Sequence, residues 1–371
     1  MNDDEDGKYH FIMYSDGQYI YAWDPVRRTE GRVIGTNFTN VQYMVTDSED
    51  SDNNYLFIAD QLEDGSYQIS RFYVATNFSD SEDYTDEDYY PPSIILDYDT
   101  NKTIWSGPEI NGLCINTDDL AVYWSSPTEQ TIYKYKYADK EDKDDGDNST
   151  TSTSNSTSNA TVEEVADEDD EDEDDESAEY VVPFLQNKTQ LSYILGMDCN
   201  QDTGLYWFNA VDADSVSNTS LYQMDYDSDG DDSDTNSSDG GSIELILSNL
   251  SSPYSLICDN DQKDTVYYYI DDDLYRVKAG TLDDEDETGL LAKGIGIYKN
   301  LFFYEDIIYA ANDQEMYQIS DYYTKKWQPN EVVDVPGITA AAFFISSNAM
   351  TVAFSSTLLY LSLYLAYWLD K

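Results

Sequence analysis

The segment Val122-Tyr123-Trp124-Ser125-Ser126 is followed, after a polar turn, by Ile132-Tyr133-Lys134. The first part is apolar and aromatic, and the second begins with an aliphatic residue and a tyrosine, which are side chains typical of β-strands. The same pair of strands returns at Leu205-Tyr206-Trp207-Phe208-Asn209 and Leu221-Tyr222-Gln223. A pattern that returns along the chain indicates a repeat architecture.

Six copies of this pair can be found in the chain. The first strands are Phe11-Ile12-Met13-Tyr14-Ser15-Asp16, Tyr55-Leu56-Phe57-Ile58-Ala59-Asp60, Val122 to Ser126, Leu205 to Asn209, Val266-Tyr267-Tyr268-Tyr269-Ile270-Asp271 and Ile307-Ile308-Tyr309-Ala310-Ala311-Asn312. The second strands begin at Ile20, Ile69, Ile132, Leu221, Leu274 and Met316. Further apolar runs precede most first strands, at 112–115, 195–199, 254–258 and 296–298, or follow second strands, at 93–96, 181–185 and 243–247. Each unit therefore has four strands, which is the blade of a β-propeller.

The two ends of the chain complement each other. The first unit lacks a preceding strand, and a spare one, at 336–342, follows the sixth unit. We therefore predict an all-β protein, a six-bladed β-propeller of four-stranded blades spanning 1–345, with its ring closed by N- and C-terminal strands. Closure removes the open sheet edges that would otherwise promote aggregation.

The Tyr-Trp pairs resemble the repeats of the YWTD propellers of the low-density lipoprotein receptor class. The resemblance covers roughly residues 9–342. The Thr-Asp that follows Tyr-Trp in that family is replaced by Ser125-Ser126 and Phe208-Asn209, and a basic third residue of the second strand is kept at Arg71, Lys134 and Arg276. The resemblance implies an extracellular ligand-binding or structural role.

The chain is strongly acidic, with 76 Asp and Glu against 19 Lys and Arg and a formal net charge of −57. An acidic insertion at 139–179 has a Ser/Thr/Asn-rich centre and is predicted to be disordered, and a second acidic loop is predicted at 225–241. Such a charge excludes nucleic acid as a partner, because binding to phosphates requires clustered Lys and Arg. It favours cations and basic protein partners.

The compartment is indicated by ten Asn-x-Ser/Thr sequences, which are acceptors for N-linked glycans in a secreted protein. They are Asn37, Asn77, Asn101, Asn148, Asn155, Asn159, Asn187, Asn218, Asn236 and Asn249. Against secretion, the first residues have neither a basic region nor an apolar core. The cysteines Cys114, Cys199 and Cys258 are expected to be buried in equivalent strands; one pair can be bridged, and the odd count leaves one over.

Sequence motifs for catalysis are weak. His10 is the only histidine, and we place it before the first strand, far from any nucleophile motif. Asp225, Asp227 and Asp229 match the first half of a calcium loop, but the second half fails because Asn236 stands where Glu is needed. A turn after a strand explains the same residues. We expect no enzyme activity and no cofactor beyond weak, diffuse binding of Ca²⁺.

The C-terminal tail, 346–371, contains an uncharged stretch at 349–369. Its length suits a membrane span of about 20 residues. A lipid-anchor signal and two further blade strands are the alternatives.

The sequence therefore predicts a non-catalytic, extracellular or cell-surface glycoprotein that binds protein partners, acts in adhesion or forms a coat by self-assembly. We expect its contacts on aromatic-rich faces of the ring. The alternatives are an acidic matrix protein that gathers calcium and a calcium-dependent propeller hydrolase.

Overall fold

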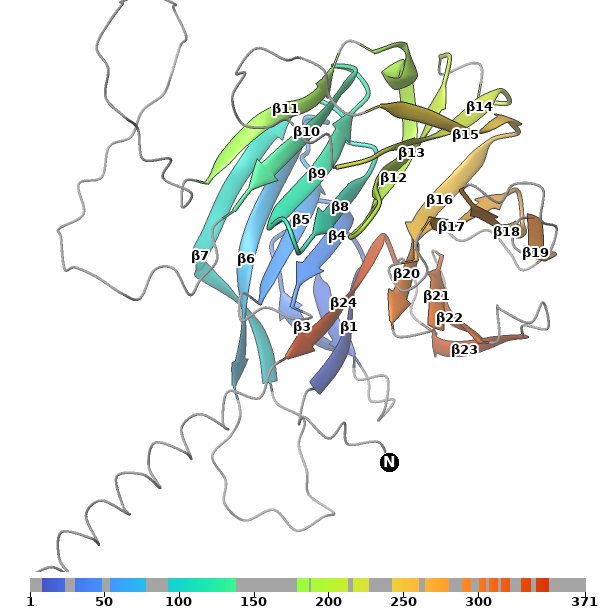
Figure 1. Cartoon of the computed structure of the whole chain (residues 1–371). Helices are drawn as coiled ribbons and strands as arrows, with labels where there is room; N and C mark the ends of the chain where they lie inside the picture. Colours follow the sequence, from blue (N-terminus) through green and yellow to red (C-terminus); the bar gives the residue numbers. More distant parts are fainter. Residues whose placement is uncertain are drawn as a thin grey trace, which may run out of the picture.

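The chain folds into six antiparallel sheets of four strands each, arranged around a common axis (Figure 1). The computed structural model describes residues 9–23, 31–48, 54–77, 93–137, 179–186, 188–212, 216–226, 242–259, 264–279, 289–294, 300–304, 307–312, 315–320, 328–334 and 338–346. The innermost strand of each sheet contacts the innermost strands of the two neighbouring sheets, so that the six sheets close a ring. The prediction of an all-β, six-bladed propeller is confirmed.

We number the blades along the chain and name their strands from the axis outward. Blade 1 contains β24 (Ala340–Ser346), β1 (Tyr9–Ser15), β2 (Ile20–Trp23) and β3 (Arg32–Gly35). Blade 2 contains β4 (Val41–Asp47), β5 (Tyr55–Gln61), β6 (Tyr67–Asn77) and β7 (Ser93–Gly107). Blade 3 contains β8 (Leu113–Asn116), β9 (Ala121–Ser126), β10 (Thr131–Lys136) and β11 (Tyr180–Gln186).

The other three blades repeat this order. Blade 4 contains β12 (Tyr193–Asn200), β13 (Gly204–Ala210), β14 (Thr219–Met224) and β15 (Ile243–Leu250), preceded by the short 3-10 helix η2 (Thr189–Leu191). Blade 5 contains β16 (Pro253–Cys258), β17 (Thr265–Ile270), β18 (Asp273–Lys278) and β19 (Gly289–Ala292). Blade 6 contains β20 (Asn300–Tyr304), β21 (Ile307–Ala311), β22 (Glu315–Ser320) and β23 (Gln328–Asp334).

The ring is closed in blade 1 by strands from both ends of the chain. β24 pairs antiparallel with β1, and Met13 lies opposite Ala342. The spare strand that the sequence predicted after the sixth unit is therefore the innermost strand of the first blade.

The second strand of each blade explains the apolar repeats. Every described residue of β9 and of β13 is buried. Such a strand lies between two neighbouring blades, so both of its faces are covered and its sequence reads as a continuous apolar run rather than an alternation. Within it, Trp124 packs toward blade 2 and Tyr123 toward blade 4. A Tyr-Trp pair thus fills two interfaces at once.

The core is divided into six apolar clusters, one between each pair of neighbouring blades. Most tyrosines of the repeats lie in these clusters; Tyr206, Tyr267 and Tyr269 are fully buried. Our expectation that aromatic side chains gather on the faces of the ring is wrong for these residues, because the neighbouring blade covers them. Aromatic rings are well suited to such interfaces because they bury a large area.

The propeller has two faces that differ in their connections. The short-turn face holds the turns between second and third strands and the links from each outer strand to the next blade. The long-connection face holds the links between third and outer strands, among them 138–178 and 227–241. Because β24 runs toward the long-connection face, Tyr9 and Ser346, which pair with each other, both lie there.

One sequence prediction is wrong, and two others concern residues outside the described ranges. His10 lies within β1, where its ring contacts Phe343 edge-on, and not before the first strand. The run at 296–298, like the tail stretch at 349–369, falls outside the described residues; the innermost strand of blade 6 is Asn300–Tyr304. In the part of the chain that the structure describes, no helix has the length and apolarity needed to cross a membrane.

Candidate functional site

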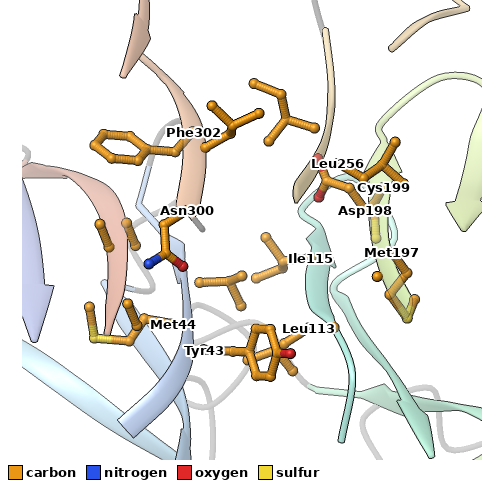
Figure 2. Close-up of a pocket in the computed structure, with 18 of the residues that line it drawn as sticks. Tyr43, Met44, Leu113, Ile115, Met197, Asp198, Cys199, Leu256, Asn300 and Phe302 are labelled. Carbon is orange, nitrogen blue, oxygen red and sulfur yellow. The ribbon is translucent and has the colours of Figure 1, made fainter. Parts of the chain in front are cut away.

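A cavity of about 470 Å³ lies on the axis of the propeller, between the six innermost strands (Figure 2). Its wall exposes polar and apolar surface in about equal shares. It includes Tyr43 and Met44 of β4, Leu113 of β8, Leu256 of β16 and Phe302 of β20. We call this cavity the central channel.

One carboxylate stands in this wall. Among the described residues that line the channel, Asp198 of β12 is the one acidic side chain, and none is basic. Asp198 Oδ2 accepts a hydrogen bond from the backbone N–H of Cys258, at 2.8 Å. Burial raises the pKa of Asp198 to about 7, although the backbone N–H groups of Cys258 and Cys199 act in the opposite direction.

Three of the innermost strands pair irregularly near the short-turn face. The registers of β4, β12 and β16 each skip one residue close to the start of the strand, at Gln42, Leu195 and Ser255. Such bulges bend a strand and redirect its side chains. At Gly196, beside one of these bulges, a Cβ atom would meet no atom within 4 Å. This glycine therefore borders open space inside the channel.

Buried Asp and Asn residues form a polar belt at the other end of the innermost strands. They are Asp47, Asn116, Asn200 and Asp259, each at most 2% exposed. The belt is structural. Asn200 Oδ1 accepts the backbone N–H groups of Asp202 and Thr203, at 3.0 and 2.9 Å, and so closes the turn into the next strand. The sequence reasoning missed this signal, an Asp or Asn at or directly after the end of the innermost strand in blades 2 to 5.

The three cysteines lie on consecutive innermost strands, so the expectation that they are buried in equivalent strands is confirmed. Cys114 of β8 and Cys199 of β12 form a disulfide between blades 3 and 4, and Cys258 of β16 is a buried thiol outside it. Burial first, and then the charges of Asp198 and Asp259, raise the pKa of Cys258 far above its usual value. A thiol held neutral in this way is a poor nucleophile.

A buried ion pair holds the end of the acidic insertion. Glu179, the residue before β11, accepts a hydrogen bond from Arg71 Nη1 at 2.8 Å, pairs with Lys102 and accepts a second hydrogen bond from Tyr135 at 3.0 Å. The Arg71 guanidinium also lies 4.4 Å from the ring centre of Tyr55. Burial opposes the ionised form of Glu179, but the two cations outweigh it and lower its pKa to about 2.

Of the three calcium-loop residues, the structure describes one. Asp225 is exposed directly after β14, whereas Asp227 and Asp229 lie outside the described residues. Among the residues that the structure does describe, no three His, Cys, Asp or Glu side chains lie close enough together to hold a metal ion.

Four of the glycosylation acceptors are described as exposed: Asn37, Asn101, Asn218 and Asn249. Asn77 is the last residue of β6. The acceptors Asn148, Asn155, Asn159, Asn187 and Asn236 lie outside the described residues.

The short-turn face carries a set of exposed acidic residues that the sequence analysis did not single out. They stand in the turns between second and third strands of blades 2 to 5: Glu63, Asp64, Glu129, Asp212, Asp271 and Asp272. We call them the turn carboxylates. The repeat itself produces them, because each such turn is short and polar and lies on the same face.

Comparisons with known proteins find similarity in fold alone. No family model matches the chain, and no curated protein matches it. A chain from the crystal structure of a nidogen/laminin complex superimposes with a TM-score of 0.54 and 10% identity, over 90% of this chain and 98% of that one. The two chains share the six-bladed propeller fold. The resemblance to YWTD propellers is thereby confirmed at the level of fold.

Two other solved structures are also similar. A putative 6-phosphogluconolactonase from Bacteroides uniformis has a TM-score of 0.49 and 9% identity, over 91% of this chain and 99% of that one. A protein from Lactobacillus plantarum has a TM-score of 0.47 and 12% identity, over 91% and 99%. Identities this low transfer no activity and no partner, because one fold hosts many functions.

Proposed function

We propose that this propeller is an extracellular binding protein that takes a basic protein partner on its short-turn face, without a catalytic step. The turn carboxylates are the observation that carries the proposal. Four of the six blades present exposed carboxylates on one face, in turns that are held between paired strands. Lys188 and Lys293 are the exposed bases described in the links of this face.

Such a face selects a partner by its charge. A surface of one sign steers an oppositely charged protein into contact, and it disfavours partners of the same sign. The best match is a protein with a patch of lysines and arginines large enough to contact several blades at once.

The acceptor sites and the disulfide support a location outside the cell. Asn37, Asn101, Asn218 and Asn249 are exposed, so a glycan at each can extend into solvent. A disulfide between Cys114 and Cys199 is stable in an oxidising compartment. Ser346 ends β24 on the long-connection face, so a membrane attachment through 349–369 would leave the short-turn face pointing away from the membrane.

The test compares two charge-reversal variants of the full chain. In the first, Glu63, Glu129 and Asp271 are changed to lysine; in the matched control, three acidic residues away from this face are changed, Asp97, Asp99 and Glu244. Affinity for a cationic model protein such as hen lysozyme is measured by calorimetry at several salt concentrations. We expect the first variant to bind at least tenfold more weakly than the control.

Equal loss in both variants would contradict the proposal, because binding would then depend on total charge and not on the short-turn face. Many weak calcium sites in a calcium titration of the same protein would then favour the matrix protein.

Cross-linking from a photoreactive residue at position 129 identifies the natural partner on cells.

A further inference from the structure

We propose that the central channel binds a small apolar amine, a molecule with a hydrocarbon or aromatic body and a single ammonium group. The site is separate from the short-turn face and does not depend on the proposed partner. Its volume of about 470 Å³ lies within the range of about 300–1,000 Å³ that is usual for small-molecule sites.

The wall of the channel determines the sign of the ligand's charge. Asp198 is the one ionisable acid among the described lining residues, and no lysine, arginine or histidine faces it there. An anion would therefore meet only repulsion. An ammonium group gives the partly buried carboxylate a counter-ion, which offsets the cost of holding a charge away from bulk water.

The remaining lining suits the body of such a ligand. Tyr43, Leu113 and Phe302 line the same channel as Asp198 (Figure 2), and they offer apolar and aromatic surface. Asn300 donates from Nδ2 to the backbone oxygen of Thr339, at 3.1 Å. This contact fixes the amide, whose oxygen lies on the channel side and can accept a second hydrogen bond (Figure 2).

A metal ion fits this site less well. Ca²⁺ takes about six to eight oxygen ligands, commonly from several carboxylates. The described lining offers one carboxylate, Asp198, and otherwise uncharged side chains, among them amides and hydroxyls. A single negative charge among otherwise uncharged lining residues matches a monovalent organic cation.

The ionisation of Asp198 gives the binding a pH dependence. Its pKa is raised to about 7, and the titratable groups that act on it, Cys258 and Tyr226, have pKa values raised by burial and stay neutral. Alkylamines keep their proton well above neutrality, as lysine does. Affinity should therefore rise about tenfold from pH 6 to pH 8, in proportion to the ionised fraction of Asp198.

The experiment uses two probes with the same body, 2-phenylethylamine and 2-phenylethanol, and titrates each into the full chain by calorimetry in 150 mM NaCl. We expect the amine to bind at least tenfold more tightly than the alcohol at pH 8. Asp198→Asn keeps the size of the side chain and its acceptor for Cys258, and it should remove the preference for the amine. Asp225→Asn, an exposed acid outside the channel, should leave it unchanged.

A second variant tests the location. Gly196→Trp places a large side chain in the open space beside this glycine, and it should abolish binding of both probes while the melting temperature confirms that the protein is folded. The proposal is overturned if neither probe binds at millimolar concentration, if Asp198→Asn retains the preference, or if Gly196→Trp still binds the amine.

Discussion

Blade 3 is joined to its two neighbours in different ways. On the blade 4 side, the disulfide between Cys114 and Cys199 links two innermost strands close to the axis. On the blade 2 side, Glu179 pairs with Arg71 and Lys102 farther from the axis, among the third and outer strands. The first is a covalent link in an apolar interface, and the second is an ionic network in an aromatic one.

The difference shows how a ring of similar blades acquires individual interfaces. Each of the two interfaces has its own apolar cluster between the second strands, and the repeat supplies the residues of both clusters. The additional links lie where the repeat varies, at the innermost strand on one side and at the end of an insertion on the other. The disulfide restricts the unfolded chain, whereas the ionic network acts only in the folded state.

Breaking the covalent link should have the largest effect. The double change of Cys114 and Cys199 to alanine opens a loop with a sequence separation of 85 residues. The chain-entropy relation gives about 4.6 kcal/mol of lost unfolding free energy for such a loop. Denaturant unfolding measures this loss. As a control, Cys258→Ala should cost only about 1 kcal/mol, and an equal loss in the control would show that the bridge itself contributes little.

Breaking the ionic network should cost somewhat less. Glu179→Gln leaves Arg71 buried without its counter-ion, and we expect a loss of about 3 kcal/mol in unfolding free energy. Glu244→Gln removes an exposed carboxylate of β15 and should change stability by less than about 0.5 kcal/mol. Matching losses in these two variants would mean that Glu179 is effectively a surface residue.

The ionisation of Glu179 also predicts how the stability of the protein depends on pH. The pKa of Glu179 is lowered to about 2 in the folded protein from a usual value of 4.5. Its contribution is therefore fully present above pH 4.5 and is lost as the pH falls toward 2. Unfolding measured at several pH values should show the native protein and Glu179→Gln converging in stability over this window. A difference that stays constant down to pH 2 would contradict the assignment.

A smaller effect is expected at the other end of the insertion. The Tyr137 hydroxyl donates to Asp47 Oδ2 at 2.8 Å, between blades 3 and 2. Tyr137→Phe removes this hydrogen bond and leaves a buried carboxylate with one donor fewer, which should cost about 1–2 kcal/mol. Tyr180→Phe, at a half-exposed tyrosine of β11, serves as the matched control and should be neutral; a cost as large as that of Tyr137→Phe would contradict the role of the buried bond.

The smallest effect should follow from removing the insertion itself. Lys136 and Tyr180 are paired across β10 and β11, so the two ends of the insertion meet. A short Gly/Ser linker in place of 139–178 retains Tyr137 and Glu179 and should leave the melting temperature within a few degrees of the native value. A large destabilisation would show that the blades depend on contacts from the removed residues.

The sequence predicts the ring and not these links. The repeated strand pairs around Trp124 and Trp207 predict the blades, and the spare run near Ala340 predicts closure. Glu179 has no such signal, because it is one acid among many in the run that precedes β11, and only the pairing of β10 with β11 places it beside Arg71. Asp198 was likewise missed, because a single carboxylate between Met197 and Cys199 carries no motif.

The sequence predicts where the strands lie better than it predicts which side of a strand each residue faces. The expectation of aromatic faces failed for Tyr206, Tyr267 and Tyr269, because the neighbouring blade covers each of them. That contact is made by residues far away in the chain. The cysteines show the converse. The apolar residues that lead into each cysteine predicted that all three are buried in equivalent strands, but spacing alone could not decide which two are joined.

Cysteine mapping of the intact protein, made in an oxidising secretory host, tests the ring most directly. Free thiols are alkylated before and after denaturation, and peptides are then mapped by mass spectrometry without reduction. The ring predicts that Cys114 and Cys199 are joined and that Cys258 reacts only after unfolding, because β8, β12 and β16 are consecutive innermost strands. A bridge between Cys114 and Cys258, whose strands β8 and β16 are separated by β12, or reaction of Cys258 in the folded protein, would contradict this arrangement of the blades.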